Sequence, residues 1–313
     1  MKFGFGIDLG GTTVKIASFD EAGTLLDKWE IPTVTQNGGE QILPDIAKAV
    51  LEYVQQKNIA QEDVLGIGLG VPGSVRPDGV VNKCDNLGWG ICNPAQILKG
   101  LTGFSVVAQN DANIAALGEF AKGSGAKYQS MLLVTLGTGV GGGIVLAGKV
   151  LTGAHGAAGE IGHIVLNPEE TESCNCGKKG CVEQYCSATG IVRVAKKYLS
   201  ENSKPSVLTD VATLTCKDVF DAAKAEDQAA MAILEQVYDY MALFIANICN
   251  AIDPEAVVIG GGVSKAGQPL LDGIGRHLAK YIYHAAASVE FSLASLGNDA
   301  GVYGAFQLLM DKE

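Results

Sequence analysis

The chain is poor in charge and has no long apolar run. Charged residues make up 18% of its 313 residues and hydrophobic residues 47%, a balance that excludes an intrinsically disordered protein. No stretch of about eighteen consecutive apolar residues occurs, so we expect no membrane partner. The N-terminus lacks the apolar core of a signal peptide and soon reaches an acidic residue, Asp8. These absences predict a cytoplasmic protein.

Clusters of lysine and arginine are absent as well. The net charge is −11, and because nucleic acids select basic surfaces, we expect no nucleic-acid partner. If the substrate carries phosphates, backbone NH groups and a metal ion must neutralise them. What the chain has in excess is glycine, with 41 residues, roughly twice the average share. Many of these glycines are clustered, which indicates tight turns close to a ligand.

The order of the expected elements predicts an α/β fold. Residues 3–19 and 131–148 share one plan, an apolar strand, a glycine turn and a second apolar strand, so the chain contains a weak internal repeat. No low-complexity linker separates the halves, which favours a boundary near residues 111–123 and a cleft between two domains. Strands are expected at residues 2–9, 14–19, 24–31, 64–71, 106–109, 130–136, 144–146 and 256–259, and helices at residues 39–57, 112–120, within 189–252, and at 300–310.

The first glycine turn follows the first expected strand. Backbone NH groups and threonine hydroxyls in such a turn can bind phosphates, and an aspartate at the strand end could hold Mg²⁺ through water. The alternative is an ordinary glycine hairpin, and the G-K-[ST] ending of the nucleotide P-loop is missing. The candidate nucleotide ligands here are Asp8, Gly10, Gly11, Thr12, Thr13 and Lys15.

A second turn lies between two apolar strands and contains five glycines in the seven residues 137–143. Glycine weakens strands, so this composition indicates that a ligand or another backbone needs the space. Two such turns predict the two sides of one polyphosphate site. A third cluster could form the floor of an adenine site, although glycine is also common where a helix starts after a strand. The candidate ligands are Gly137, Thr138, Gly139, Gly141, Gly261 and Gly262.

Asn110 and Asp111 stand at the junction of an expected strand and an expected helix. A carboxylate at this place could orient an acceptor hydroxyl and remove its proton, as phosphoryl transfer requires. The alternative is that Asp111 caps the helix N-terminus, a role that both Asp and Asn favour. The residues by themselves leave both interpretations open.

Three cysteines occur within eight residues, shortly after a histidine. In a reducing compartment this pattern indicates a metal site before a disulfide, and a Cys₃His set has the ligand count of a closed structural zinc site. The expected zinc ligands are His163, Cys174, Cys176 and Cys181. Glu160 and Glu183 flank this cluster and could accept hydrogen bonds from sugar hydroxyls. The alternative for both glutamates is a solvated surface position.

Taken together, these motifs resemble the ROK family of sugar kinases, and within it the bacterial glucokinases. The resemblance covers nearly the whole chain, and the occurrence of all the motifs in this order is far more specific than any one of them. The matching segments are residues 8–15, 86–89, 110–118, 133–143, 160–163, 174–183, 187–193, 260–264 and 296–302.

The resemblance implies the actin-like, ribonuclease-H-like ATPase fold, with two α/β domains around a cleft and a structural zinc site. The smaller domain would comprise residues 1–115 and 300–313, and the larger one residues 116–299. ATP, Mg²⁺ and Zn²⁺ are the implied cofactors. Relatives of this kind are usually homodimers or homotetramers.

The implied activity is transfer of the γ-phosphate of ATP to the 6-hydroxyl of a hexose, with glucose as the expected sugar. Asp111 would be the catalytic base, and zinc would hold His163 in place as a sugar ligand. The residues expected to contact the sugar are Asn86, Asn110, Asp111, Glu160, His163 and Glu183.

Three alternatives stay open at this point. The sugar could be another hexose or amino sugar, such as N-acetylglucosamine, N-acetylmannosamine, fructose or mannose. A non-catalytic sugar sensor would bind sugar without forming ADP. A zinc-dependent interaction module would leave both phosphate turns unexplained. Family members that act as repressors carry a DNA-binding helix-turn-helix before the first phosphate turn, and we expect none here because that turn begins at residue 8.

Overall fold

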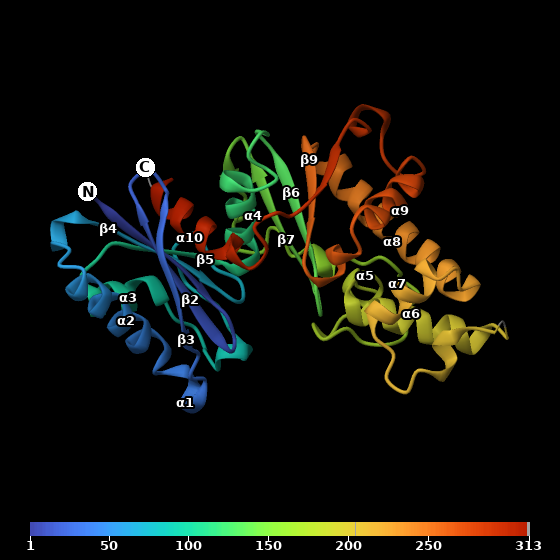
Figure 1. Cartoon of the computed structure of the whole chain (residues 1–313), viewed down its shortest axis with the longest axis horizontal. Coiled ribbons are helices and arrows are strands. Elements are labelled where there is room, and N and C mark those ends of the chain that lie inside the picture. Colours follow the sequence, from blue (N-terminus) through green and yellow to red (C-terminus); the bar gives the residue numbers. More distant parts are fainter. Residues whose placement is uncertain (204, 312–313) are drawn as a thin grey trace. The chain divides into compact units, whose positions relative to one another are not determined.

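The N-terminal part of the chain forms a five-stranded mixed sheet (Figure 1). In the computed structural model, which describes residues 1–203 and 205–311, the strand order is β3-β2-β1-β4-β5. The first three strands pair antiparallel, and β4 and β5 continue from β1 in parallel. The strands are β1 (Phe3–Leu9), β2 (Thr13–Asp20), β3 (Leu25–Pro32), β4 (Val64–Val71) and β5 (Val106–Asn110).

Helices cover both faces of this sheet (Figure 1). On one face, Ile42, Ile46 and Val50 recur every four residues and are buried in the same core as the strand residues, as the sequence pattern predicts. On the other face, the rings of Phe19 and Phe306 stack at 4.5 Å. The helices are α1 (Gln36–Gly39), α2 (Ile42–Gln56) and α3 (Pro94–Thr102) on the first face, and α4 (Asp111–Lys122) and α10 (Ala300–Met310) on the second.

A second five-stranded sheet has the order β10-β9-β6-β7-β8. Strand β9 pairs in parallel with both β6 and β10. Strands β6 and β7 are neighbours joined by a glycine turn, as β1 and β2 are, which confirms the predicted internal repeat. The strands are β6 (Met131–Leu136), β7 (Val140–Leu146), β8 (Lys149–Val150), β9 (Ala256–Gly260) and β10 (Glu290–Leu293).

The region between β8 and β10 is mostly helical. The longest helix, α8 (Gln228–Ile252), is the one described helix long and apolar enough to cross a membrane by length and composition alone. Within the chain, 61% of its apolar window is buried, and it packs against α6, α7 and α9, as a core helix does. The other helices are α5 (Glu183–Cys186), α6 (Ala188–Glu201), α7 (Cys216–Lys224) and α9 (Gln268–Leu278).

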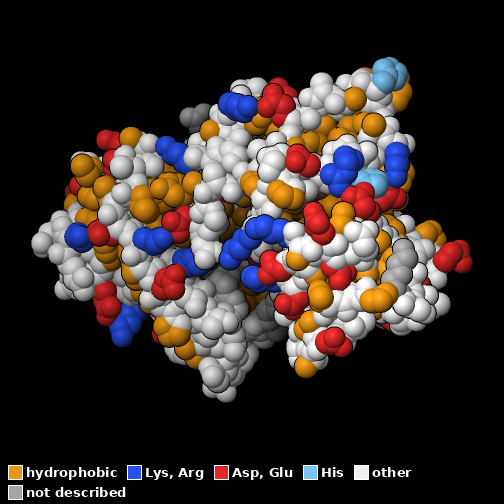
Figure 2. Space-filling view, turned by 45° about the vertical axis from the view of Figure 1, so that its right-hand side comes forward, with side chains coloured by type: hydrophobic (Ala, Val, Ile, Leu, Met, Phe, Trp, Pro, Cys, Tyr) orange, Lys and Arg blue, Asp and Glu red, His pale blue; other side chains and the backbone are white. Residues whose placement is uncertain are grey.

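The chain divides into two compact units: the first contains the whole first sheet together with β8 and most of β7, and the second contains β6, β9, β10 and the start of β7. Unit 1 comprises Met1–Gln129, Gly143–Gly159 and the segment from Ser295 onward, and unit 2 comprises Ser130–Gly142 and Glu160–Ala294. The domain boundaries expected from the resemblance remain a prediction. Figure 2 shows acidic and basic side chains interspersed over the visible face, with no broad basic patch on it.

Candidate active site

The turn between β1 and β2 is closed by backbone hydrogen bonds. The amide of Gly10 donates to the carbonyl oxygen of Thr13 at 3.0 Å, and Thr33 Oγ1 donates to the carbonyl oxygen of Gly10 at 2.7 Å. Gly11 and Thr12 at the tip are exposed. The tip of the turn is therefore accessible to a ligand while its base is fixed.

Asp8 is held at the end of β1 from two sides. Lys15 Nζ lies 3.3 Å from Asp8 Oδ2 and donates to the carbonyl oxygen of Asn298 at the same distance. Helix α10 approaches so closely that a Cβ on Gly301 would lie 2.6 Å from the Asp8 carboxyl carbon. Lys15 thus supplies a fixed positive charge beside the turn.

Asn110, not Asp111, caps α4. Its Oδ1 accepts hydrogen bonds from the amides of Ala112 at 2.9 Å and Asn113 at 3.1 Å. The interpretation of Asp111 as the cap is therefore wrong. Asp111 is the first residue of the helix, its side chain is exposed, and Asn110 Nδ2 donates to Asp111 Oδ1 at 3.0 Å. The cap thus orients an accessible carboxylate at the positive end of the helix.

Gln109, which is 5% exposed, holds the cap in place. Its Oε1 accepts from the Asn110 amide at 2.8 Å and from Asn113 Nδ2 at 3.2 Å, and its Nε2 donates to Thr152 Oγ1 at 2.8 Å. This residue is not among those predicted from the sequence. Its one signal there is a polar residue near the end of an otherwise apolar strand.

The turn and the Asn110–Asp111 pair lie at the same edge of the first sheet. In the strand register, Asp8 faces Gly70 and Gly70 faces Gln109. Because neighbouring strands are about 4.8 Å apart, Asp8 lies roughly 10 Å from Gln109 across the sheet. Asn86 is exposed in a short 3₁₀ turn, and none of the described hydrogen bonds joins it to this group.

In unit 2, the turn between β6 and β7 is tied to the start of α6. The amide of Gly137 donates to the carbonyl oxygen of Gly139 at 3.0 Å. The amide of Ala188 donates to the Gly137 carbonyl oxygen, and Thr189 Oγ1 donates to the Thr138 carbonyl oxygen, both at 2.8 Å. The helix start therefore fixes the turn from outside it.

Gly261 and Gly262 follow β9 at the same edge of the second sheet, because β9 runs parallel to β6. Gly261 has φ +83°, and a Cβ on it would lie 2.5 Å from the Leu136 carbonyl oxygen, so the position requires glycine. Gly262 lines a cavity of about 310 Å³ whose wall includes Cys216 and Phe220. This cavity is small and mostly apolar, as suits a planar base.

Glu183 connects the second turn to the cysteine cluster. Its Oε2 accepts a hydrogen bond from the Val140 amide at 3.0 Å, and a Cβ on Gly139 would lie 2.3 Å from that oxygen. Its Oε1 lies 3.8 Å from Cys174 Sγ. Gly141 follows the turn inside β7 and is half-buried. Glycine at position 139 therefore leaves room for a carboxylate of unit 2, and a larger residue there would make Glu183 move.

Glu160 and His163 belong to one short segment. Glu160 is exposed and directly precedes the 3₁₀ turn Ile161–His163. A Cβ on Gly162 would lie 2.1 Å from the Val140 carbonyl oxygen, so this segment packs directly on the start of β7. The segment therefore brings the histidine next to the second turn.

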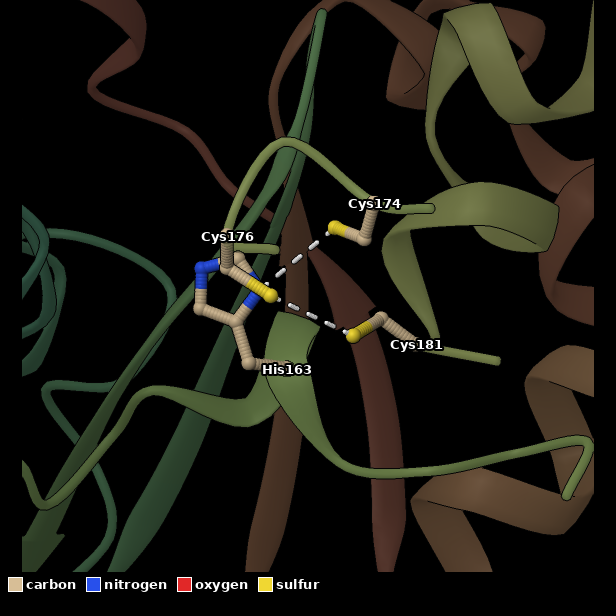
Figure 3. A group of neighbouring side chains, drawn as sticks. All are labelled: His163, Cys174, Cys176 and Cys181. Atoms are coloured by element: carbon tan, nitrogen blue, oxygen red, sulfur yellow. Dashed lines mark hydrogen bonds between the residues drawn. The ribbon is translucent and has the colours of Figure 1, made fainter. Parts of the chain in front are cut away.

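The Cys₃His set converges on one point, as Figure 3 shows. The four ligand atoms all lie within 4.8 Å of one another. Cys176 Sγ is 3.6 Å from Cys181 Sγ, and Cys174 Sγ is 4.0 Å from His163 Nδ1. Four ligands about 2.3 Å from a tetrahedral zinc ion would lie about 3.8 Å from each other, so the residues fit zinc.

The three thiols differ in acidity. Burial, together with the neighbouring thiols, raises the pKa of Cys181 to about 12, and burial also raises that of Cys174. For Cys176 burial acts in the same direction, but hydrogen bonds from the Lys178 amide and the neighbouring thiols outweigh it and lower the pKa. Because zinc binds thiolates, metal binding here must release protons.

The structure thus brings the expected site residues into two groups, one in each unit. Asn86 belongs to unit 1 as well, although none of the described hydrogen bonds joins it to Asp8, Asn110 or Asp111. Unit 1 contains Asp8, Gly10, Gly11, Thr12, Thr13, Lys15, Asn110 and Asp111, and unit 2 contains Gly137, Thr138, Gly139, Gly141, Glu160, His163, Cys174, Cys176, Cys181, Glu183, Gly261 and Gly262.

Comparison with known proteins gives a consistent result. A profile of the ROK family matches residues 4–312. A glucokinase of Halalkalibacterium halodurans is 46% identical over 98% of this chain and 95% of its own length, and one of Thermotoga maritima is 35% identical over 98% and 97%. The crystal structure of a ROK family glucokinase from Streptomyces griseus in complex with glucose and AMPPNP is 31% identical, with a TM-score of 0.74 over 98% of both chains.

Proposed function

This chain belongs to the ROK family, with its actin-like ATPase fold, and on that basis we propose that it is an ATP-dependent glucokinase. It transfers the γ-phosphate of ATP to the 6-hydroxyl of glucose and forms glucose 6-phosphate and ADP. The relatives named glucokinase and the related structure with glucose and AMPPNP support this assignment. The observation that carries it is the exposed Asp111 carboxylate, oriented by a capping asparagine at the same sheet edge as the first glycine turn.

Asp111 acts as the general base for the sugar hydroxyl. The proton of the 6-hydroxyl passes to a carboxylate oxygen as the bond between the sugar oxygen and phosphorus forms. Asn110 and Gln109 keep this carboxylate in one orientation, so the base needs no rearrangement at the moment of reaction. Asn110 and Asn86 are the further sugar contacts that unit 1 supplies.

In unit 2, Glu160, His163 and Glu183 form hydrogen bonds with the other sugar hydroxyls. Buried hydrogen bonds to hydroxyls discriminate strongly, because an analogue without the hydroxyl leaves a polar group unpaired. His163 and the three cysteines would hold zinc, which would fix the imidazole ring so that its other nitrogen could bind the sugar. The metal is structural in this proposal and takes part in no chemical step.

The nucleotide binds through both glycine turns. Lys15 and the backbone NH groups of the turns neutralise the phosphates, and the adenine enters the cavity beside Gly262. Asp8 would hold Mg²⁺, which would supply further positive charge to the phosphates. We also propose that the chain forms a homodimer or homotetramer. Light scattering after size exclusion, which gives the mass of the particle in solution, tests that part separately.

The decisive experiment is a coupled ADP-release assay with MgATP across a sugar panel. The panel comprises glucose, mannose, fructose, N-acetylglucosamine and N-acetylmannosamine. We expect the highest kcat/KM for glucose and formation of glucose 6-phosphate. Turnover highest on an amino sugar would replace the proposed substrate, and sugar binding without ADP formation on any sugar would make the chain a sensor.

A further inference from the structure

A polar network in unit 2 has no part in the proposed mechanism. It centres on Arg193 of α6, whose Nη2 lies 2.6 Å from Glu170 Oε2 and whose Nε lies 2.8 Å from Glu172 Oε2. Both glutamates belong to the segment that leads directly into Cys174. One guanidinium group therefore holds two points of the loop that enters the cysteine cluster.

Tyr185 of α5 strengthens the contact to Glu170. Its hydroxyl donates to Glu170 Oε2 at 2.5 Å and accepts from Asn167 Nδ2 at 3.0 Å, while the Arg193 guanidinium lies 5.5 Å from the centre of its ring. Burial acts to raise the pKa of Glu170, but the hydrogen bonds from Tyr185, the Glu172 amide and Arg193 lower it to about 2. The Glu170 carboxylate is therefore ionised at neutral pH.

Gln184 ties both sides of the same loop to α5. Its Nε2 donates to the Glu172 carbonyl oxygen at 3.0 Å, before the first cysteine. Its Oε1 accepts from the Cys181 amide at 3.1 Å, at the last cysteine. The start and the end of the cysteine loop are thus held to one residue.

The two ion pairs of Arg193 are unequal. The Glu170 side chain is 9% exposed, whereas the Glu172 side chain is 70% exposed. Exposed ion pairs contribute little to stability, whereas the cost of losing a partner grows as the remaining charge is more shielded from water. The pair with Glu170 is therefore the one that matters, and Glu172 contributes mainly through its backbone oxygen.

Three successive residues of α5 contact either the cysteine loop or the candidate active site. Gln184 and Tyr185 hold the cysteine loop, and Glu183 accepts the hydrogen bond from the second glycine turn. We propose that Arg193 is a positioning residue: through Glu170 and α5 it holds the cysteine loop in ligating geometry before the metal binds, and keeps Glu183 aligned with it. The part concerning Glu183 and sugar rests on the proposed function.

The first test measures zinc affinity by competition with a chromophoric chelator, using the full-length chain. Arg193→Met keeps most of the length of the side chain and removes its charge, and we expect zinc affinity to fall by about 10- to 100-fold. Arg193→Lys keeps the positive charge but cannot contact both glutamates as the guanidinium group does, so its zinc affinity should lie between those of wild type and Arg193→Met. Arg276→Met is the matched control, because Arg276 also forms a surface ion pair within unit 2, with Glu235. Unchanged zinc affinity in Arg193→Met overturns the proposal.

A second pair of variants tests the inequality of the two carboxylates. Glu170→Gln should reproduce the loss of zinc affinity, whereas Glu172→Gln should leave it within about twofold of wild type, because that side chain is exposed. The reverse order overturns the proposal. These mild substitutions also serve if Arg193→Met fails to fold.

Hydrogen exchange of the zinc-free chain separates positioning from general destabilisation. In Arg193→Lys we expect faster exchange in residues 167–186 and unchanged exchange elsewhere. Faster exchange throughout unit 2 would assign Arg193 to the overall stability of the unit and overturn the proposal.

The sugar assay gives a further readout of the same proposal. In Arg193→Met, the KM for glucose should rise about tenfold while kcat stays nearly unchanged. If the wild type phosphorylates no sugar, the proposed function fails, but the zinc and exchange measurements still decide the role of Arg193.

Discussion

In unit 1 the glycine turn between β1 and β2 is flanked by a lysine–aspartate pair, whereas in unit 2 the turn between β6 and β7 is held by a glutamate next to the cysteine loop. Both turns join two neighbouring strands, yet the space around Gly11 in the first turn differs from the space around Gly139 in the second. A Cβ on Gly11 would meet nothing within 4 Å, but one on Gly139 would collide with the Glu183 carboxylate. Position 11 of the first turn thus leaves open space for a ligand, and position 139 of the second leaves room for a side chain of its own unit.

The same strand–turn–strand arrangement thus has different surroundings in the two units, and each set of surroundings suits a different task. Unit 1 combines its turn with an exposed carboxylate at a helix start, which suits proton removal and phosphate binding. Unit 2 combines its turn with a carboxylate, a histidine and a metal cluster, which suits reading a sugar. A change confined to one side of this comparison should therefore leave the other side intact.

The largest effect is expected from Asp111→Asn. Removing the base without changing side-chain size should lower kcat by about 10²- to 10⁴-fold, because only proton removal is lost. AMPPNP affinity, measured by calorimetry, should be unchanged. Asp45→Asn is the matched control, an aspartate in the first turn of α2 in the same unit. A kcat within twofold of wild type would remove Asp111 from the proposed mechanism.

Zinc removal should affect unit 2 alone. After dialysis against a strong chelator, we expect KM for glucose to rise by about 10- to 100-fold, since His163 loses its fixed orientation. Hydrogen exchange should increase around the cysteine cluster and stay unchanged in β1, β2 and α4. A metal analysis that finds less than one zinc per chain in the untreated protein, or equal increases of exchange in both units, would contradict this assignment.

Much of the fold could be predicted from the sequence because its strongest signals are local. The strand at residues 64–71 is an apolar run between polar and glycine punctuation, and the structure places β4 at those residues. The cap could not be assigned, because Asn110 and Asp111 have nearly equal propensities and the choice depends on the backbone angles at the strand end. Glu183 and the two glycine turns could be singled out, but not which contact each makes.

The network behind the cysteine loop was not predictable for a different reason. Arg193 lies more than twenty residues from both of its carboxylate partners, and an arginine on a helix surface is usually solvated. Gln109 and Thr152 meet across 43 residues in the same way. Such pairs are set by the packing of whole elements, which no local pattern in the chain encodes.

Two glycine substitutions should give opposite readouts and sharpen the comparison of the turns. Gly139→Ala forces Glu183 to move, so we expect a cost of about 1–3 kcal/mol in the free energy of unfolding without any ligand, together with weaker sugar binding. Gly11→Ala should leave the melting temperature unchanged, because its Cβ meets nothing, but should raise KM for ATP.

The measurements are calorimetric melting of the ligand-free protein and initial rates at varied ATP and glucose. If Gly11→Ala melts lower than Gly139→Ala, the space at the first turn serves the fold rather than a ligand. The two variants differ by one methyl group each from the same parent, so they are each other's control.

The smallest effect is expected from acid, acting through the Glu170 carboxylate of unit 2. The pKa of Glu170 is about 2 in the folded chain, below its ordinary value of 4.5, so its contribution to stability is fully present above pH 4.5 and is lost as the pH falls toward about 2. In zinc-free protein, the difference in melting temperature between wild type and Glu170→Gln should therefore be constant above pH 4.5 and shrink below it. The zinc-free form is needed because acid also protonates the metal ligands. A difference that grows as the pH falls would mean that the protonated carboxyl, not the carboxylate, is the form that Arg193 and Tyr185 stabilise.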